Sequence, residues 1–322
     1  MKLISIIVPM YNEEEVVDFF FEGINKVLKE LEKSYEFEII TVNDGSKDST
    51  LEKLYTRQKI DDRLRVVNLT RNFGHESAVA AGLSVARGDA IIPMDADLQD
   101  PPQLIVPMLE LFEKGFAVVN ARRASRKEDT WIKRYTAHQF YKVIDKLAGK
   151  VKVPSNVGHY RLISRPVLLE ILKLQEHNRV FRVQVPYIGY KTAEVAFIRP
   201  AREHGKTHYN FRSMFDLAFN AIISTTIKPV YWPLKFAVVF AGLTMLSVIG
   251  QIVLFIINLL DPASMMMFDH PLWLVLNIIL VSFSVVIFFL GLIAIYVGKT
   301  FIESQHRPFF IVESVKGKED IT

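Results

Sequence analysis

Two long uncharged stretches near the C-terminal end constrain this chain more than any other feature. No charged residue occurs from Phe236 to Leu260 or from Leu272 to Gly298. Each stretch exceeds the roughly 20 residues that a helix needs to cross a bilayer. We therefore expect two transmembrane helices within residues 233–299, joined by a short extracytoplasmic loop at 261–271. A pair of buried helices in a large soluble core is the alternative interpretation.

The charges around these stretches predict their orientation. Lys228 and Lys235 precede the first stretch and Lys299 follows the second, whereas the connecting loop has no Lys or Arg. Cytoplasmic flanks carry the excess of Lys and Arg, so both flanks should face the cytoplasm. We expect a plasma (inner) membrane protein with two spans and a cytoplasmic tail at 300–322. Residues 211–232 should form an amphipathic helix, either at the membrane interface or packed on the soluble domain.

The composition removes several classes of function. The 39 Lys and Arg against 35 Asp and Glu leave a formal charge of +4, which is too small to make nucleic acid an expected partner. The chain has no cysteine, so disulfides, thiolate metal sites and cysteine nucleophiles are excluded.

Short apolar runs alternate with longer amphipathic segments over roughly the first 120 residues. This alternation predicts an α/β fold with a doubly wound, mostly parallel sheet, in a cytoplasmic domain over residues 1–210. The expected helices are Glu13–Leu31 and Pro101–Lys114, and the expected strands are Leu3–Pro9, Phe37–Val42, Leu64–Leu69, Ala90–Met94 and Ala117–Ala121.

Acidic residues follow three of these strands. Glu13 comes after the first, Asp44 after the second, and Asp95 and Asp97 after the fourth. Ligands bind beyond the carboxyl ends of the strands in such sheets, so these groups should converge on one crevice. Two carboxylates at alternate positions suit Mg²⁺ or Mn²⁺ bridging a diphosphate.

A set of ordered motifs runs through nearly the whole chain. The motifs are Val8-Pro-Met-Tyr-Asn-Glu13, Val42-Asn-Asp-Gly-Ser46, Arg71-Asn-Phe-Gly-His-Glu76, Gly88-Asp89, Asp95-Ala-Asp-Leu-Gln-Asp-Pro-Pro102, Asn156-Val-Gly-His-Tyr-Arg-Leu-Ile-Ser164 and Arg202-Glu-His-Gly-Lys-Thr-His-Tyr209. Together they resemble the motifs of family 2 glycosyltransferases with a GT-A fold. Within that family the chain is most similar to the polyprenyl-phosphate glycosyltransferases, nearest to the bactoprenol glucosyltransferases and more distantly to the dolichol-phosphate mannose synthases.

This resemblance implies an enzyme that transfers one sugar, with inversion, from a nucleotide sugar to a polyprenyl phosphate such as undecaprenyl phosphate, for cell-surface glycan modification. The implied cofactor is Mg²⁺ or Mn²⁺, and the expected donor is UDP-glucose or another UDP-hexose, with GDP-mannose as the alternative. Relatives form oligomers, so a homo-oligomer is expected. The family implies that the nucleoside is held by Pro9, Tyr11, Glu13 and Asp44, and that the metal and diphosphate are served by Asp95, Asp97 and Gln99.

A lipid phosphate acceptor requires positive charge to hold it against the sugar. Arg122 lies at the end of the fifth expected strand, and Arg202 and Lys206 lie in a loop that the family would fold over the donor and acceptor phosphates. A membrane-facing basic surface is the alternative role for these cations. Further candidates are Arg123, Arg126, Lys133 and Arg134.

His159 departs from the family pattern, because its position is usually acidic in the bactoprenol enzymes. A histidine there could accept a proton or hold a phosphate, or it could be a structural substitution, and both interpretations stay open. A phosphomonoester is largely dianionic near neutral pH, by analogy with phosphorylated side chains. We therefore hypothesise that no catalytic base is essential.

Three other functions fit the sequence less well. Processive polymer synthases of the family carry a Gln-x-x-Arg-Trp motif, which this chain lacks. A membrane-anchored nucleotide-sugar-binding accessory protein should have lost a metal ligand, but Asp95, Asp97 and Gln99 are all present. An ion- or lipid-transport component should carry ionisable groups in its spans, and only Gln251 and Asn277 are strongly polar there.

Overall fold

The computed structural model describes residues 1–124, 157–174, 181–198 and 271–317, with scattered residues between 236 and 260. Contacts divide the chain into two compact units. One consists of Met1–Met214 together with Arg307–Thr322, and the other of Phe215–His306.

The first unit alternates strands and helices as the sequence predicts. All five expected strands and both expected helices are confirmed, and the second helix begins with a short 3₁₀ turn, η1. The elements are β1 (Lys2–Met10), α1 (Val17–Leu31), β2 (Tyr35–Asn43), α2 (Thr50–Gln58), β3 (Leu64–Leu69), α3 (His75–Val85), β4 (Ala90–Pro93), η1 (Pro102–Leu104), α4 (Ile105–Glu113), β5 (Val118–Arg123), β6 (Val157–Ser164), α6 (Arg165–Lys173), α7 (Phe181–Ile188), β7 (Thr192–Phe197) and β8 (Val312–Lys316).

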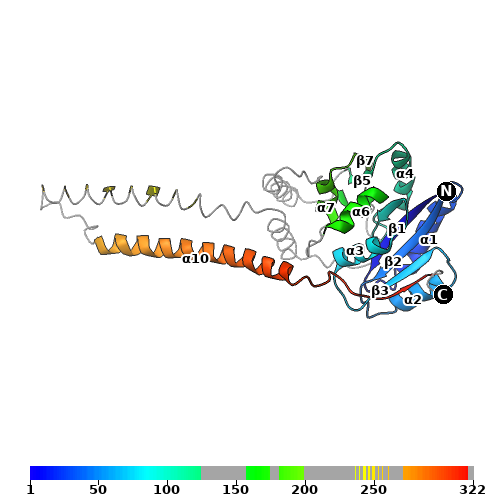
Figure 1. Ribbon diagram of the computed structural model, residues 1–322, viewed down its shortest axis with the longest axis horizontal. Helices are drawn as coiled ribbons and strands as arrows, with labels where there is room; N and C mark the ends of the chain where they lie inside the picture. Colours follow the sequence, from blue (N-terminus) through cyan, green and yellow to red (C-terminus); the bar gives the residue numbers. More distant parts are fainter. Residues whose placement is uncertain are drawn as a thin grey trace. The chain divides into compact units, whose positions relative to one another are not determined.

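These strands form one sheet in the order β7-β5-β6-β4-β1-β2-β3-β8. In its centre, Ile6 of β1 pairs with Ile39 of β2 and with Ile92 of β4, both in parallel. The sheet is mixed, because β6 pairs antiparallel with β4 and β5, and β8 pairs antiparallel with β3. The other described strands run in one direction, so the carboxyl ends of β1, β2, β3 and β4 lie at the same end of the sheet. Figure 1 shows β1, β2 and β3 of this sheet.

Alternate residues of the central strands pack on opposite faces of the sheet. Ile6 of β1 and Ile39 of β2 pack with buried residues of α1, α2 and α4. Ile7 and Ile40, one position later, pack with α3, α6 and α7 on the other face. Both faces of these strands are buried, which explains why they are nearly continuous apolar runs in the sequence.

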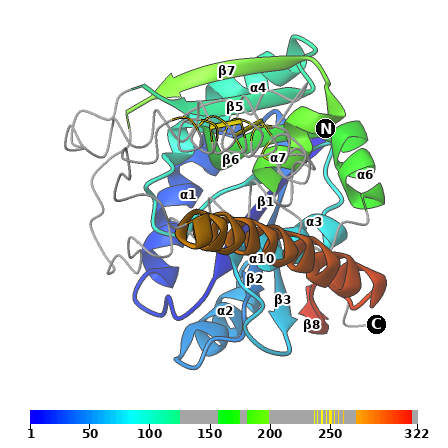
Figure 2. The same ribbon diagram turned by 90° about the vertical axis from the view of Figure 1, so that its left-hand side faces the viewer.

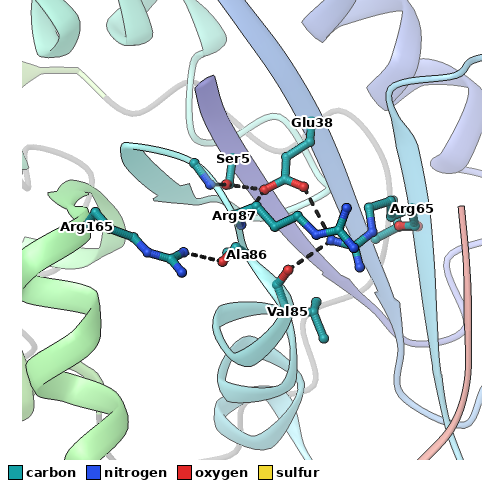
Figure 3. A network of polar contacts seen from close by, with 9 residues as sticks. Ser5, Glu38, Arg65, Val85, Ala86, Arg87 and Arg165 are labelled. Atoms are coloured by element: carbon teal, nitrogen blue, oxygen red, sulfur yellow. Dashed lines mark hydrogen bonds and ion pairs between the residues drawn. The ribbon is translucent and has the colours of Figure 1, made fainter. Parts of the chain in front are cut away.

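A polar network fixes the C-terminal end of α3 near the amino ends of β1, β2 and β3 (Figure 3). Glu38 Oε1 accepts hydrogen bonds from Ser5 Oγ and from the backbone N–H of Arg87. Arg65 donates to the Val85 carbonyl at 2.9 Å, and Arg165 donates to the Ala86 carbonyl. These two arginines satisfy carbonyl groups that a helix end leaves without partners. The network fixes the C-terminal end of α3, and the N-terminal end of this helix lies near the carboxyl ends of the strands.

The second unit contains α10 (Pro271–Ser304), in which the portion Val285–Ser304 includes an 18-residue stretch with a mean hydropathy of 2.3. Among the described residues it is the one helix long and apolar enough to cross a membrane. α10 contains the whole second uncharged stretch, Leu272–Gly298. The first expected span stays a prediction, because only scattered residues of it are described, although these are helical. The expected helix at 211–232 and the loop at 261–270 lie outside the described residues.

Candidate active site

The loops that follow β1 and β2 are joined by hydrogen bonds. Ser46 Oγ accepts the backbone N–H of Asn12 at 3.0 Å, and Asn12 Oδ1 accepts the backbone N–H of Lys47 at 2.8 Å. Glu13 is held by a hydrogen bond from its N–H to Thr50 Oγ1 at 2.9 Å. Asn12 has a φ of 52°, a strained value for a residue other than glycine, of the kind found at functional sites. The two loops therefore form one surface.

Asp44 extends this surface to the loop after β3. Its side-chain oxygens accept the backbone N–H groups of Phe73 at 2.7 Å and Gly74 at 2.9 Å. Burial raises the pKa of Asp44, and these hydrogen bonds oppose part of that rise. Gly45 has a φ of 66°, and a Cβ added there would lie 2.4 Å from the backbone carbon of Arg71. Only glycine allows the two loops to approach this closely.

The loop after β4 carries the three expected metal ligands. Asp97 Oδ1 accepts the backbone N–H of Gln99 at 3.1 Å. Leu98 lies between them with a φ of 53°, and a Cβ added to Gly23 of α1 would lie 2.8 Å from its side chain. Tyr160 of β6 donates its hydroxyl to the carbonyl of Pro101 at 2.8 Å. Contacts with α1 and β6 thus fix the middle and the end of this loop.

The donor groups of this loop fit a small divalent cation. The described residues contain no group of three or more His, Asp and Glu side chains that could hold a metal ion. Asp95 and Asp97 supply two carboxylates and Gln99 supplies an amide oxygen. Mg²⁺ is commonly bound by one or two carboxylates, with substrate phosphates and water as its other ligands. The residues present therefore suit a divalent cation whose remaining ligands come from a diphosphate and water.

A cluster of histidines and carboxylates connects this loop to β6. His75 Nε2 lies 3.8 Å from Asp95 Oδ1, and the rings of His75 and His159 meet edge to face at 4.8 Å between centroids. His159 Nε2 lies 3.2 Å from Glu76 Oε1. The structure thus brings His159 of β6 next to the first turn of α3 and, through His75, toward Asp95.

Glu76 joins three elements in this cluster. Besides contacting His159, its Oε2 accepts the backbone N–H of Phe181, the first residue of α7, at 3.2 Å. The ring of Phe181 stacks on His159 with 6.2 Å between centroids. Burial raises the pKa of Glu76, but the hydrogen bonds from His159 and Phe181 outweigh burial and hold that pKa below its usual value. Glu76 is therefore a charged carboxylate that fixes His159 in place.

A buried arginine lies beneath this cluster. Arg161 is 0% exposed, and its guanidinium carbon lies 5.2 Å from the centroid of the Phe181 ring. Its Nη2 donates to the Gly158 carbonyl at 2.7 Å, while Nε and Nη1 have no hydrogen-bond partner in the structure as described. Burial, together with the charge of Arg182, lowers the pKa of Arg161 to about 9.

The other expected site residues lie in different situations. Pro9 is within β1, and Tyr11 follows that strand with 43% of its surface exposed. Arg122 forms an ion pair with Glu194 of β7 at 3.2 Å, and both side chains are about half exposed. Several expected cations lie outside the described residues, namely Arg126, Lys133, Arg134, Arg202 and Lys206.

Sequence reasoning missed the role of Glu76. Both Glu76 and His75 were named only as positions of the motif Arg71-Asn-Phe-Gly-His-Glu76. Neither contact to His159 has a local sequence signal, because His159 lies on a strand far along the chain.

The chain matches the model of the family described as "Glycosyl transferase family 2" over residues 5–172. A prophage bactoprenol glucosyl transferase homolog from Escherichia coli is 36% identical over 97% of this chain and 99% of its own length. The bactoprenol glucosyl transferase of Shigella phage SfV is 35% identical over 98% of this chain and 99% of its own. An uncharacterized glycosyltransferase from Synechocystis is 36% identical over 98% and 96%.

Solved structures resemble the chain more distantly. Glucosyl-3-phosphoglycerate synthase from Mycobacterium tuberculosis, in complex with Mn²⁺, UDP and phosphoglyceric acid, is 18% identical with a TM-score of 0.46, covering 69% of this chain and 77% of its own. The family match and the near full-length relatives establish that the chain belongs to glycosyltransferase family 2 and is a glycosyltransferase.

Proposed function

We propose that this glycosyltransferase transfers one sugar from a nucleotide sugar to a polyprenyl phosphate, such as undecaprenyl phosphate, with inversion at the anomeric carbon. The observation that carries the proposal is the similarity along almost the whole chain, including the apolar C-terminal region, to proteins named bactoprenol glucosyl transferase. UDP-glucose or another UDP-hexose is the proposed donor. The long apolar helix α10 supports a membrane-bound enzyme. The Lys residues that flank the two uncharged stretches favour a catalytic unit on the cytoplasmic face.

The joined loops after β1, β2 and β3 are the proposed nucleoside site. Asp44 joins the loop after β2 to the loop after β3, and Pro9, Tyr11 and Glu13 are the proposed contributions from the end of β1 and the loop that follows it. Asp97, Gln99 and Asp95 would hold Mg²⁺ or Mn²⁺ together with the diphosphate. When bound, the cation would stabilise negative charge on the departing nucleoside diphosphate.

The acceptor phosphate needs positive charge more than it needs a base. Arg122 is the described candidate for this role, and Arg202 and Lys206 are proposed to join it. Glu194 lies within 3.2 Å of Arg122, so the guanidinium has a carboxylate partner that a phosphate would have to replace. This exchange is feasible because an ion pair exposed to solvent contributes little free energy.

We propose that His159 is not an essential catalytic base. Its contact with Glu76 at 3.2 Å and the stacked ring of Phe181 restrict its orientation, which fits either a phosphate-holding or a structural role. The variant His159→Ala should therefore retain turnover within roughly tenfold of the native enzyme, below the typical contribution of general base catalysis. Loss of turnover with donor and lipid binding intact would show that His159 is the base.

The test of the proposed function is transfer of radiolabelled sugar from a panel of UDP- and GDP-sugars to undecaprenyl phosphate by the full chain. We expect label in the lipid phase from one UDP-hexose, with Mg²⁺ or Mn²⁺, and none with EDTA. Label from GDP-mannose would make this a mannosyltransferase. Nucleotide binding without label from any donor would support a membrane-anchored accessory protein instead.

A further inference from the structure

The C-terminal tail returns from α10 to the sheet of the catalytic unit and adds a strand to it. β8 pairs antiparallel with β3, and the backbone N–H of Thr70 donates to the Ile311 carbonyl at 3.1 Å (Figure 2). Lys316 lies over the ring of Tyr55 in α2 at 4.0 Å, and Ser314 is hydrogen-bonded to the Tyr55 hydroxyl at 3.3 Å. The tail is thus an integral edge of the sheet.

The pairing of β8 with β3 contains an irregularity that selects one residue, Glu313. Asn68 pairs with Ser314, but the next residue, Leu69, pairs with Val312, so Glu313 is the extra residue of a β-bulge. Bulges redirect side chains at sheet edges. Here the Glu313 carboxylate turns to the side chain of Asn68, and Oε2 accepts from Nδ2 at 2.5 Å.

From Glu313 a line of hydrogen bonds crosses two strands. Asn68 Oδ1 accepts from Asn43 Nδ2 at 2.7 Å, and Asn43 Oδ1 accepts the backbone N–H of Ser46 at 3.3 Å. Asn43 is 1% exposed and Asn68 is 7% exposed, so water competes little for these groups. The line ends in the loop whose Ser46 Oγ accepts the N–H of Asn12.

The charge of Glu313 determines which group of each asparagine donates and which accepts in this line of hydrogen bonds. A carboxylate can only accept, so Asn68 must turn its NH₂ group to Glu313 and its carbonyl oxygen to Asn43. Asn43 must then turn its NH₂ group to Asn68 and its oxygen to Ser46. Without Glu313, only the Ser46 N–H at the other end of the line favours this orientation. The flipped orientation, in which Ser46 N–H faces an NH₂ group and loses its acceptor, then becomes more accessible.

We propose that Glu313, in the tail that follows α10, is a positioning residue for the nucleotide site. It acts through Asn68 and Asn43 to hold the loop at 44–47 in its binding conformation. This inference rests on the proposed function, in which that loop holds the nucleoside. Because the line reaches only this loop, Glu313 governs affinity for the nucleotide and not affinity for the lipid.

The test is UDP binding, with Mg²⁺, to the purified full chain by titration calorimetry, alongside the KM values for donor and lipid. Glu313→Ala should weaken UDP binding and raise the donor KM by about three- to tenfold, as expected for loss of one hydrogen bond's contribution. The lipid KM should not change. Glu313→Gln keeps an acceptor oxygen but can also donate to Asn68, so it no longer fixes the orientation and should recover only part of the lost affinity.

Lys316→Ala is the matched control, because it weakens the contact of β8 with α2 and leaves the line intact. It should bind UDP as the native chain does. Equal losses in Glu313→Ala and Lys316→Ala would overturn the proposal in favour of simple strand docking, as would unchanged UDP affinity in Glu313→Ala. A native chain that binds neither UDP nor GDP would instead refute the nucleotide site, and with it the proposed function.

Discussion

Glu76 Oε1 lies 3.2 Å from Nε2 of His159, and the other oxygen of the same carboxylate accepts the backbone N–H of Phe181. One side chain thus joins the first turn of α3 to β6 and to the start of α7. The arginine contacts at Val85 and Ala86 hold the far end of α3 (Figure 3). Both ends of this helix are therefore fixed by side-chain contacts.

Removal of the Glu76 carboxylate should destabilise the catalytic unit. Glu76→Ala leaves the Phe181 N–H and His159 without their acceptor, at a cost of about 1–2 kcal/mol for a partly exposed group. The melting temperature of the purified chain should fall accordingly. Glu76→Gln is the control, because its amide can still accept from Phe181, and it should lose clearly less. Equal melting temperatures for Glu76→Ala and the native chain would contradict this role.

The acid sensitivity of the unit should depend on the same residue. The folded pKa of Glu76 is below its usual value, so its stabilising contribution is complete above the unfolded pKa of roughly 4.3 and is lost as pH falls through the folded value. The difference in melting temperature between the native chain and Glu76→Gln should therefore shrink as the pH falls below about 4. A difference that grows below this pH would reverse the sign of the argument.

Gly45 should be irreplaceable where the two nucleotide loops meet. Gly45→Ala combines a φ of 66° with a clash against the backbone of Arg71, and both effects destabilise, by about 2–4 kcal/mol together. UDP binding should be lost with the displaced loop. Gly115→Ala has a comparable φ of 85° but nothing within 4 Å, so it isolates the backbone strain, about 1–2 kcal/mol, and should retain UDP binding.

Much of the fold could be predicted because its central strands are buried on both faces. Leu3–Pro9 and Phe37–Val42 are apolar runs that can be identified as buried strands without knowledge of the strands beside them. β8 was not predicted, since Val312–Lys316 contains two charged residues and becomes a strand only by pairing with β3. β6 was also missed, and its Arg161 is fully buried although nothing local in the sequence indicates burial.

The candidate site was predictable where its residues follow strands. Asp44, Asp95 and Asp97 lie at the carboxyl ends of β2 and β4, as the α/β pattern requires. The partners of these residues depend on tertiary contacts. No local rule pairs Glu76 with His159 or turns Asp44 toward the N–H groups of Phe73 and Gly74.

Arg122 should affect the lipid and not the donor. In the proposed function, Arg122→Gln removes a charged contact with the acceptor phosphate, so the KM for undecaprenyl phosphate should rise about tenfold or more while the donor KM stays constant. Glu194→Gln is the matched variant, because it removes the carboxylate that pairs with Arg122 and leaves the guanidinium in place. It should leave the lipid KM unchanged or lower it. A rise in donor KM for Arg122→Gln would assign this arginine to the nucleotide diphosphate.

The central claim is sugar transfer to a polyprenyl phosphate at the loop after β4, and one measurement tests it most directly. The full chain and its Asp97→Ala variant, reconstituted with undecaprenyl phosphate, are supplied with radiolabelled UDP-glucose and Mg²⁺, and label in the lipid phase is counted. The account predicts labelled lipid from the native chain and a loss of at least about a hundredfold in Asp97→Ala. Equal labelling by both proteins would contradict the assignment of Asp97, and native protein that binds UDP yet labels no lipid from any nucleotide sugar would contradict the reaction itself.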